Sequence, residues 1–431
     1  MDAKSFKFPE HFLWGAATSS HQVEGDNIHN DWWDWEQKGK VREPSGKACD
    51  HWNRFHEDFK LAKSLHHNAH RFSIEWSRVE PEEGKFDQQA IAHYQEVIRS
   101  LRSNGLEPIV TLFHFTLPLW LAKEGGWVSA RTPKLFARYA AKMAESLGEE
   151  IHYWMTINEP VVYNFKSYLV GDWPPGEYSY EKAYLVLVHL LKGHVLAYDA
   201  IKDSEKALGL EEPQVGIAQH VSFFSPCYSN SWKDKISVWL RNLMFNHLFI
   251  QALVKGWIFY PGIFRIRLHR AKTLDFLGLN YYTRNFVHNK GFRIPGIYGD
   301  VCPVGHHPDV VKKNSLDWEI YSPGLFQLVK DFSKYRLPIL IAENGICTRS
   351  DALRSEFIVD HLRQLRKAIE WGAPVFGYLY WSLLDNYEWA DGFEPRFGLI
   401  EIDYKTQERT VRPSALLFSE VCRSGELPNG N

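Results

Sequence analysis

Two glutamates each end an apolar run that is typical of a buried β-strand. Glu159 is followed by Pro160, which has no N–H and cannot extend a central ladder. Glu343 ends a second apolar run, and Asn344-Gly345 interrupts that strand. Either glutamate alone could be a polar residue where a strand meets solvent. The same arrangement twice, with an asparagine beside each carboxyl, favours two carboxylates that face one site.

A pair of carboxyl groups is what glycoside hydrolysis requires. One protonates the leaving oxygen and the other attacks the anomeric carbon, and in the retaining mechanism they lie ~5–5.5 Å apart. Arg71 falls on the inward face of another expected strand, where a buried cation needs an anion. If Arg71 and Tyr282 contact Glu343, they favour its ionised form, and that charge favours the protonated form of Glu159. Glycosylation of Glu343 removes the charge, so that Glu159 can then ionise and activate water.

Eight apolar segments, each followed by helical spacing, would position these side chains. The expected strands are 12–17, 69–76, 109–115, 154–158, 215–221, 274–282, 338–343 and 375–381. The expected helices are 52–65, the segment between Asp87 and Asn104, 131–147, 180–202, 232–254, 325–332, 354–371 and 414–422. Residues 19–25 are expected to form a polar turn and residues 31–35 a loop. Parallel strands need such crossovers, and an eight-fold alternation predicts a (β/α)8 TIM barrel, class α/β, as a single domain over residues 1–431.

Composition narrows the function classes. The chain has 431 residues, of which 45% are hydrophobic, which favours a folded chain with a large core. Its formal net charge of -2 gives no support for nucleic acid or a membrane surface as partner. No run approaches ~18 apolar residues, so no membrane span is expected. The first seven residues lack an apolar signal core, which indicates a cytoplasmic protein. The chain has 17 Trp, 20 Tyr and 27 Phe, and aromatic faces that are not needed in the core could pack on sugar rings.

Cysteine and histidine positions give no sign of a metal or a disulfide framework. The five cysteines are scattered without a CxxC pair, which favours reduced thiols. His66-His67 and His306-His307 are expected to be surface or loop histidines, because no HExxH or carboxylate–histidine motif accompanies them. We therefore expect neither a metal nor a cofactor, and no particular oligomeric state is favoured.

Several motifs, in order along the chain, resemble those of family 1 glycoside hydrolases, the β-glucosidase and β-galactosidase family. The matching segments are 12–20, Gln22-Val23-Glu24-Gly25, Arg71-Phe72-Ser73-Ile74, Thr156 to Pro160, Gly278 to Tyr282, Glu343-Asn344-Gly345 and Trp381 to Trp389. The resemblance extends from about Phe6 to Leu417. It implies a (β/α)8 barrel that hydrolyses terminal non-reducing β-D-glycosyl residues, with small β-glycosides or short oligosaccharides as substrates.

The resemblance also implies a role for each candidate residue. Glu159 resembles the acid/base and Glu343 the nucleophile, which Arg71 and Tyr282 would orient. Asn158 would hold the sugar 2-OH, and Trp381 would form the platform under the ring. The remaining expected substrate-binding residues are Gln22, His114, Glu388, Trp389 and Phe397, of which Phe397 would line the site near Glu388.

Single residues argue against two rival activities that are found among similar proteins. The 6-phospho-β-glycosidase branch carries Ser where Glu388 stands, and Glu388 would repel a phosphate dianion. A thioglucosidase would resemble this motif with Gln at the position of Glu159. A third reading, a sugar-binding barrel without activity, is disfavoured because both carboxylates are present together with Arg71 and Tyr282. Val161, where many members have an aromatic residue after Asn-Glu-Pro, indicates that family preferences for the leaving group should not be transferred.

Overall fold

The barrel consists of eight parallel strands that close on themselves. The computed structural model describes residues 7–259, 265–293 and 295–428; residues 1–6, for which the sequence predicts no secretory signal, lie outside these ranges. The barrel strands are β1 Leu13–Ala17, β2 Ala69–Ser73, β3 Glu107–Phe113, β4 Tyr153–Asn158, β5 Gln214–Pro226, β8 Phe276–His288, β10 Ile339–Asn344 and β11 Val375–Trp381. β10 pairs with both β8 and β11, and β11 pairs with β1, so the ring closes. The predicted (β/α)8 architecture is confirmed.

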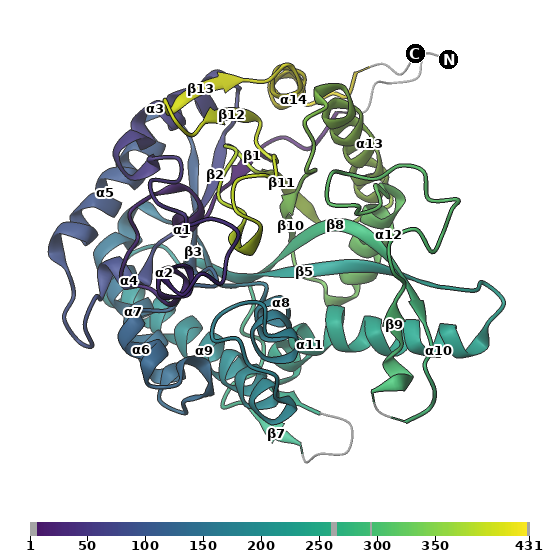
Figure 1. The fold of residues 1–431 in the computed structure, drawn as a ribbon. Coiled ribbons are helices and arrows are strands. Elements are labelled where there is room, and N and C mark those ends of the chain that lie inside the picture. The colour runs from purple at the N-terminus through teal and green to yellow at the C-terminus, as the bar shows by residue number, and fades with distance from the viewer. Residues whose placement is uncertain (1–6, 260–264, 294, 429–431) are drawn as a thin grey trace.

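Helices surround the strands on the outside (Figure 1). They are α1 Ser20–Val23, α2 Asp31–Gln37, α3 His51–Ser64, α4 Trp76–Val79, α5 Gln88–Ser103, α6 Leu119–Lys123, α7 Thr132–Leu147, α8 Pro160–Phe165, α9 Tyr180–Ala207, α10 Trp232–Arg241, α11 Leu248–Lys255, α12 Pro323–Phe332, α13 Asp351–Glu370 and α14 Pro413–Ser424. Single turns of 3-10 helix are η1 Gly126–Val128, η2 Gly148–Glu150, η5 Gly296–Tyr298, η6 Ser333–Tyr335 and η7 Trp389–Asp391, and π-helical turns are η3 Lys166–Val170 and η4 Asn242–His247.

Short strands lie outside the ring. β6 Trp257–Ile258 pairs antiparallel with β7 Ile266–Arg267, and β12 Ile400–Asp403 pairs antiparallel with β13 Glu408–Val411. β9 Asp300–Val301 adds to the far end of β8. β5 and β8 therefore continue beyond the barrel, and Figure 1 shows this extension running toward α10. The sequence predicts shorter strands here. The additional residues of β5 and β8 are in strand form because they pair with each other, and because β8 also pairs with β9.

Two main hydrophobic layers hold the barrel. The larger cluster lies between the strands and the helices and contains residues such as Trp154, Ile341 and Tyr378. A smaller cluster fills the barrel interior with Met155, Leu340 and their neighbours. The two layers follow from alternation along each strand, since successive side chains point to opposite faces.

Some sequence predictions about local structure were wrong. Residues 31–35, expected as a loop, belong to α2, because the side chain of Asn30 accepts from Trp33 N at 2.7 Å and caps the helix. Residues 20–23 of the expected turn form α1. The second strand ends at Ser73 rather than at residue 76, because Glu75 caps α4 through Ser77 N.

The helix predicted over residues 232–254 is interrupted. A different helix, α9, is more apolar than the sequence analysis predicted. α10 and α11 are separated by the π-helical turn η4. α9 is long and apolar enough to cross a membrane by length and composition, but 67% of its most apolar window is buried inside the molecule. A core helix passes the same test, and α9 packs on α7 in this way.

Candidate active site

The carboxyl ends of the barrel strands surround a cavity of about 500 Å³. This volume is within the usual range for small-molecule sites, and the position is where barrel enzymes carry their active sites. Ten of the eleven predicted site residues line it: Gln22, His114, Asn158, Glu159, Tyr282, Glu343, Trp381, Glu388, Trp389 and Phe397. The eleventh, Arg71, lies below the lining and is 1% exposed.

Glu343, near the end of β10, is held by two donors. Arg71 Nη1 donates to Oε1 at 2.5 Å and the Tyr282 hydroxyl donates to Oε2 at 2.6 Å. The expectation that Arg71 pairs with a buried anion is therefore confirmed. Burial raises the pKa of Glu343 to about 7, although the charge of Arg71 opposes this rise, and the nearby Glu159 adds to it. Both donors favour the ionised carboxylate, which is the form that can act as a nucleophile.

Glu159 connects β4 to α8 in a strained backbone conformation. Its φ of 44° and ψ of 58° lie in the left-handed region, which costs a non-glycine residue roughly 1–2 kcal/mol. Its amide donates to Ala218 O at 2.7 Å and Pro160 follows as the first residue of α8. This turn aims the carboxyl into the cavity, where Asn280 Nδ2 donates to Oε1 at 2.8 Å and His220 Nδ1 lies 3.2 Å from the same oxygen.

Asn158 links the two carboxyl groups. Its Oδ1 accepts from Arg71 Nη2 at 2.7 Å and from Asn280 Nδ2 at 3.2 Å. Since Arg71 also holds Glu343 and Asn280 also holds Glu159, one continuous hydrogen-bond chain joins the carboxyls across β10, β2, β4 and β8. A displacement of any one member would be transmitted to both acids.

His114, just beyond β3, is a neutral donor that the protein leaves available. Burial, with a smaller contribution from the charge of Arg71, lowers the pKa of His114 well below its usual value. Asn158 Nδ2 lies 3.2 Å from Nε2, so Nδ1 carries the hydrogen if Asn158 donates. Nδ1 is buried and has no partner among the described residues. The ring is nearly parallel to those of Trp381 and Trp389, with centroid distances of 6.0 and 6.1 Å.

Gln22, Trp381 and Glu388 form another part of the cavity lining. Trp381 Nε1 donates to Glu388 Oε1 at 3.3 Å, and Gln22 Nε2 lies 3.4 Å from Oε2. Gln22 also donates to the carbonyl of Tyr387 at 2.9 Å, which fixes its orientation. Burial raises the pKa of Glu388 to about 8. An acceptor that is buried with only weak partners gains from a ligand hydroxyl that donates to it.

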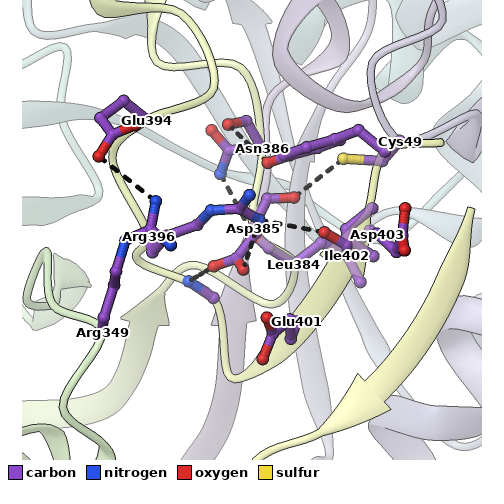
Figure 2. Close-up of polar contacts among 12 residues, drawn as sticks. Cys49, Arg349, Leu384, Asp385, Asn386, Glu394, Arg396, Glu401, Ile402 and Asp403 are labelled. Atoms are coloured by element: carbon purple, nitrogen blue, oxygen red, sulfur yellow. Dashed lines mark hydrogen bonds and ion pairs between the residues drawn. The ribbon is translucent and has the colours of Figure 1, made fainter.

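Asp385 supports the loops that carry Glu388 and Phe397. Its carboxylate accepts from Arg412 at 3.0 and 2.8 Å, from Arg396 at 3.2 Å and from the amide of Gly398 at 2.8 Å. Figure 2 shows Arg396 reaching from the neighbouring loop toward Asp385 and the carbonyl of Ile402. Because Asp385 precedes Glu388 by three residues and Gly398 follows Phe397, this ion cluster holds the loops of both residues together.

Sequence reasoning did not assign His220, Asn280 or Asp385 to the site. Asn280 could have been found, because it shares a strand face with Tyr282 and ends up beside Glu159. His220 ends the apolar part of β5 much as Glu159 ends β4, which is a weaker signal of the same kind. The pairing of Asp385 with Arg412 depends on two loops that meet only in the folded chain.

Comparisons with known proteins agree with this geometry. The family model described as "Glycosyl hydrolase family 1" matches residues 4–427. A β-galactosidase of Pyrococcus woesei is 34% identical, with 96% of each chain covered, and β-glucosidase A of Thermotoga maritima is 31% identical, with 98% of this chain and 99% of the relative covered. Among solved structures, a β-glycosidase from Pyrococcus horikoshii has a TM-score of 0.91 at 41% identity, covering 99% of this chain and 97% of that chain. A Thermotoga maritima β-glucosidase in complex with glucoimidazole has a TM-score of 0.88 at 31% identity, covering 98% and 100%.

Proposed function

The chain belongs to glycosyl hydrolase family 1, a family of retaining glycoside hydrolases, and we propose that Glu343 is its nucleophile and Glu159 its acid/base. The observation that carries this assignment is the hydrogen-bond chain from Glu343 through Arg71, Asn158 and Asn280 to Glu159. It places two carboxyl groups with different partners on one cavity, which is the arrangement that double displacement needs.

The two carboxyls take different roles because their partners differ. Glu343 receives a guanidinium and a phenol, so its ionised form is stabilised for attack on the anomeric carbon. Glu159 accepts from the neutral amide of Asn280 and has no arginine or lysine partner among the described residues, so it takes the role of the group that gives a proton to the leaving oxygen. Attack forms the bond from Glu343 to the anomeric carbon while the bond to the leaving oxygen breaks. Glu159 then accepts a proton from water, which displaces Glu343 and restores both groups.

Substrate recognition is proposed for the part of the cavity lined by Gln22, Trp381 and Glu388. Trp381 would lie under the sugar ring, while Gln22, His114, Glu388 and Trp389 would bind the outer hydroxyls and Asn158 the 2-OH. Phe397, 3% exposed and packed with Trp381, would close the wall beside the ring. This part of the cavity would take a terminal non-reducing β-D-glucosyl or β-D-galactosyl unit, as the names of the relatives suggest, and β-fucosides are a further expected class.

The proposed substrates are small β-glycosides or short oligosaccharides, with no role for nucleic acid or a membrane. The near-neutral net charge of -2 supports the first exclusion. A cytoplasmic location and a single domain over residues 1–431 stay predictions from the sequence.

Azide rescue tests the assignment of the two glutamates. Glu343→Gly removes the attacking group and leaves space on that face, so azide with an activated aryl β-glucoside should give the α-glycosyl azide in a single displacement. Glu159→Ala still forms the intermediate on Glu343, so azide in the second step should give the β-azide. NMR distinguishes the two anomers. A β-azide from Glu343→Gly would show that the nucleophile lies elsewhere.

A further inference from the structure

Beyond the barrel, β5, β8 and β9 form a short sheet that carries two cysteines at its end. Cys227 follows β5 directly and Cys302 follows β9. The amide of Cys227 donates to Val287 O and the amide of Cys302 donates to Phe286 O, each at 2.8 Å. Consecutive carbonyls of a strand point to opposite sides, so the two cysteines flank β8 from its two edges.

Two adjacent histidines complete a cluster with these cysteines. One ligand atom from each of Cys227, Cys302, His306 and His307 lies within 4.8 Å of the other three. The Cys227 Sγ and His306 Nε2 are 3.3 Å apart. For Zn–S near 2.3 Å and Zn–N near 2.0–2.1 Å, two ligands of a tetrahedral site are separated by roughly 3.5 Å. The cluster therefore needs only small side-chain shifts to surround one ion.

The backbone geometry argues against a disulfide between the same cysteines. A whole strand, β8, lies between them, and neighbouring strands are ≈ 4.7–4.9 Å apart, so their Cα atoms should be roughly 9–10 Å apart. A disulfide requires Cα atoms within about 4.4–6.8 Å. A metal ion can bridge the gap because it lies between the two sulfurs instead of joining them directly.

His307 provides a second and independent indication of a ligand. Its ring stacks on Phe286 with a centroid distance of 3.8 Å and an interplanar angle of 20°, which fixes its orientation. Its Nε2 atom is buried and has no hydrogen-bond partner among the described residues. A buried polar nitrogen without a partner is costly, and metal coordination would satisfy it.

We propose that Cys227, Cys302, His306 and His307 bind one Zn²⁺ ion as a structural Cys2His2 site. Thiolate and imidazole ligands in a tetrahedral set select zinc among the common divalent ions. Binding replaces one proton on each thiol, and the two protons pass to solvent, so the Zn²⁺ with its two thiolates is neutral. His306 is exposed, which gives the ion a path from solvent.

An alternative ligand set around Cys227 is less suitable. Asp234 and His288 also lie near Cys227, but the Asp234 carboxylate already accepts from the amides of Tyr228 and Asn289, at 3.1 and 2.8 Å. We infer that Asp234 positions the turn after Cys227, and that the two histidines that follow Cys302 complete the metal site.

The ion would stabilise the segments that form one wall of the active-site cavity. Three residues close to the proposed ligands line that cavity. Val301 directly precedes Cys302, Phe224 lies three residues before Cys227, and Asn285 directly precedes Phe286. The site is nevertheless outside the catalytic machinery, so this proposal stands independently of the assignment of Glu159 and Glu343. Its expected effect is to hold the ends of β5, β8 and β9 together.

Metal analysis of the intact enzyme tests the proposal. The wild type, prepared reduced in zinc-containing medium, should carry about one Zn²⁺ per chain by mass spectrometry of the metal. Cys302→Ser and His306→Ala should each lose most of this zinc, whereas the matched control Cys422→Ser, in α14, should retain it. Replacement of the zinc by Co²⁺ should give thiolate-to-cobalt charge-transfer absorption, which Cys302→Ser weakens. Hydrogen exchange should rise at residues 223–228 and 285–293 after chelation, with the barrel strands unchanged.

His306→Ala protects the test against misfolding, because His306 is exposed and its loss should leave the fold intact. Less than a fifth of an equivalent of zinc in wild type whose Cys227 and Cys302 are both reduced would overturn the proposal. So would full zinc content in both Cys302→Ser and His306→Ala, or a Cys227–Cys302 disulfide in non-reducing peptide maps.

Discussion

The floor of the cavity is formed by buried side chains that hydrogen-bond to one another, whereas its rim is lined by partly exposed apolar groups. At the floor, Arg71, Asn158 and Glu343 are at most 3% exposed and share hydrogen bonds. At the rim, Phe165 and Val301 are each 43% exposed. The floor is therefore a cooperative unit in which one change affects several groups, while rim residues should act separately and mildly.

Arg71→Met should give the largest effect, because it removes the shared donor at the floor. Glu343 would become a buried carboxylate without a counter-charge, and breaking a buried pair costs about 3–5 kcal/mol of unfolding free energy. Activity on an aryl β-glucoside should fall more than about 1,000-fold, since Glu343, the proposed nucleophile, would be protonated or misplaced. Denaturant unfolding and steady-state kinetics measure the two losses.

A second variant separates charge from packing at this position. Arg71→Met combined with Glu343→Gln removes both charges, so much of the lost unfolding free energy should return while activity stays absent. An equal loss of stability in the double variant would mean that packing of the Arg71 side chain, and not its ion pair, holds the floor together.

Glu388→Gln should have the next largest effect, at the border between the floor and the outer sugar hydroxyls. At a pH above 8, where Glu388 is ionised, loss of its charge-assisted hydrogen bond of about 1.5–3 kcal/mol predicts a decrease of roughly 10- to 100-fold in kcat/KM for an aryl β-glucoside. At the same pH, discrimination against the 6-phosphate of that glucoside should narrow, because the negative charge of Glu388 has been removed. Faster turnover of the 6-phosphate than of the glucoside by the wild type would contradict the proposed substrate class.

The same variant should gain stability at alkaline pH. Burial raises the pKa of Glu388 from 4.5 to about 8, so the folded state binds a proton that the unfolded state has released between these values. The unfolding free energy of the wild type therefore falls as pH rises from 4.5 through 8. Glutamine does not ionise, so the unfolding free energy of the variant does not fall for this reason. Unfolding free energies of the two proteins should diverge over this range, with the variant more stable above pH 8.

Tyr282→Phe should shift the pH profile with a smaller change in the maximum rate. The Tyr282 hydroxyl bonds to the ionised form of Glu343, whose pKa burial has raised to about 7. Loss of the bond should raise this pKa further, so the acid limb of kcat/KM should move to higher pH by about one unit. Tyr281→Phe is the matched control, since its hydroxyl donates to Tyr321 O and not to Glu343. An acid limb that moves equally in both variants would assign that limb to another group.

The floor was largely predictable from the sequence and the rim was not, for a physical reason. Glu159 and Glu343 stand at the ends of short apolar strands, directly before Pro160 and Asn344-Gly345, which are local signals. The end of β5, the interruption at η4 and the approach of Cys302 to Cys227 depend on contacts between distant segments. Only the fold brings those segments together, so spacing along the chain could not reveal them.

The smallest expected effect concerns Phe224 on the rim. Its ring contacts Phe245, which contacts His220, which in turn contacts Glu159. Phe224 therefore lies on the side of the cavity that carries Glu159, the proposed acid/base. Phe224→Ala should raise KM for an aryl β-glucoside only a few-fold, because a partly exposed ring contributes roughly 1 kcal/mol to such a contact.

Phe223 gives a matched control for this last comparison. It precedes Phe224 on β5, is also half-buried and points to the opposite face. Its ring lies tilted against Tyr321, with a centroid distance of 5.4 Å, and does not line the cavity. Phe223→Ala should lower the unfolding free energy without changing KM, whereas Phe224→Ala should change KM for aryl glucosides more than for methyl β-glucoside. If Phe224→Ala instead lowered kcat as strongly as Glu388→Gln, the rim would belong to the same cooperative unit as the floor, and the distinction between them would fail.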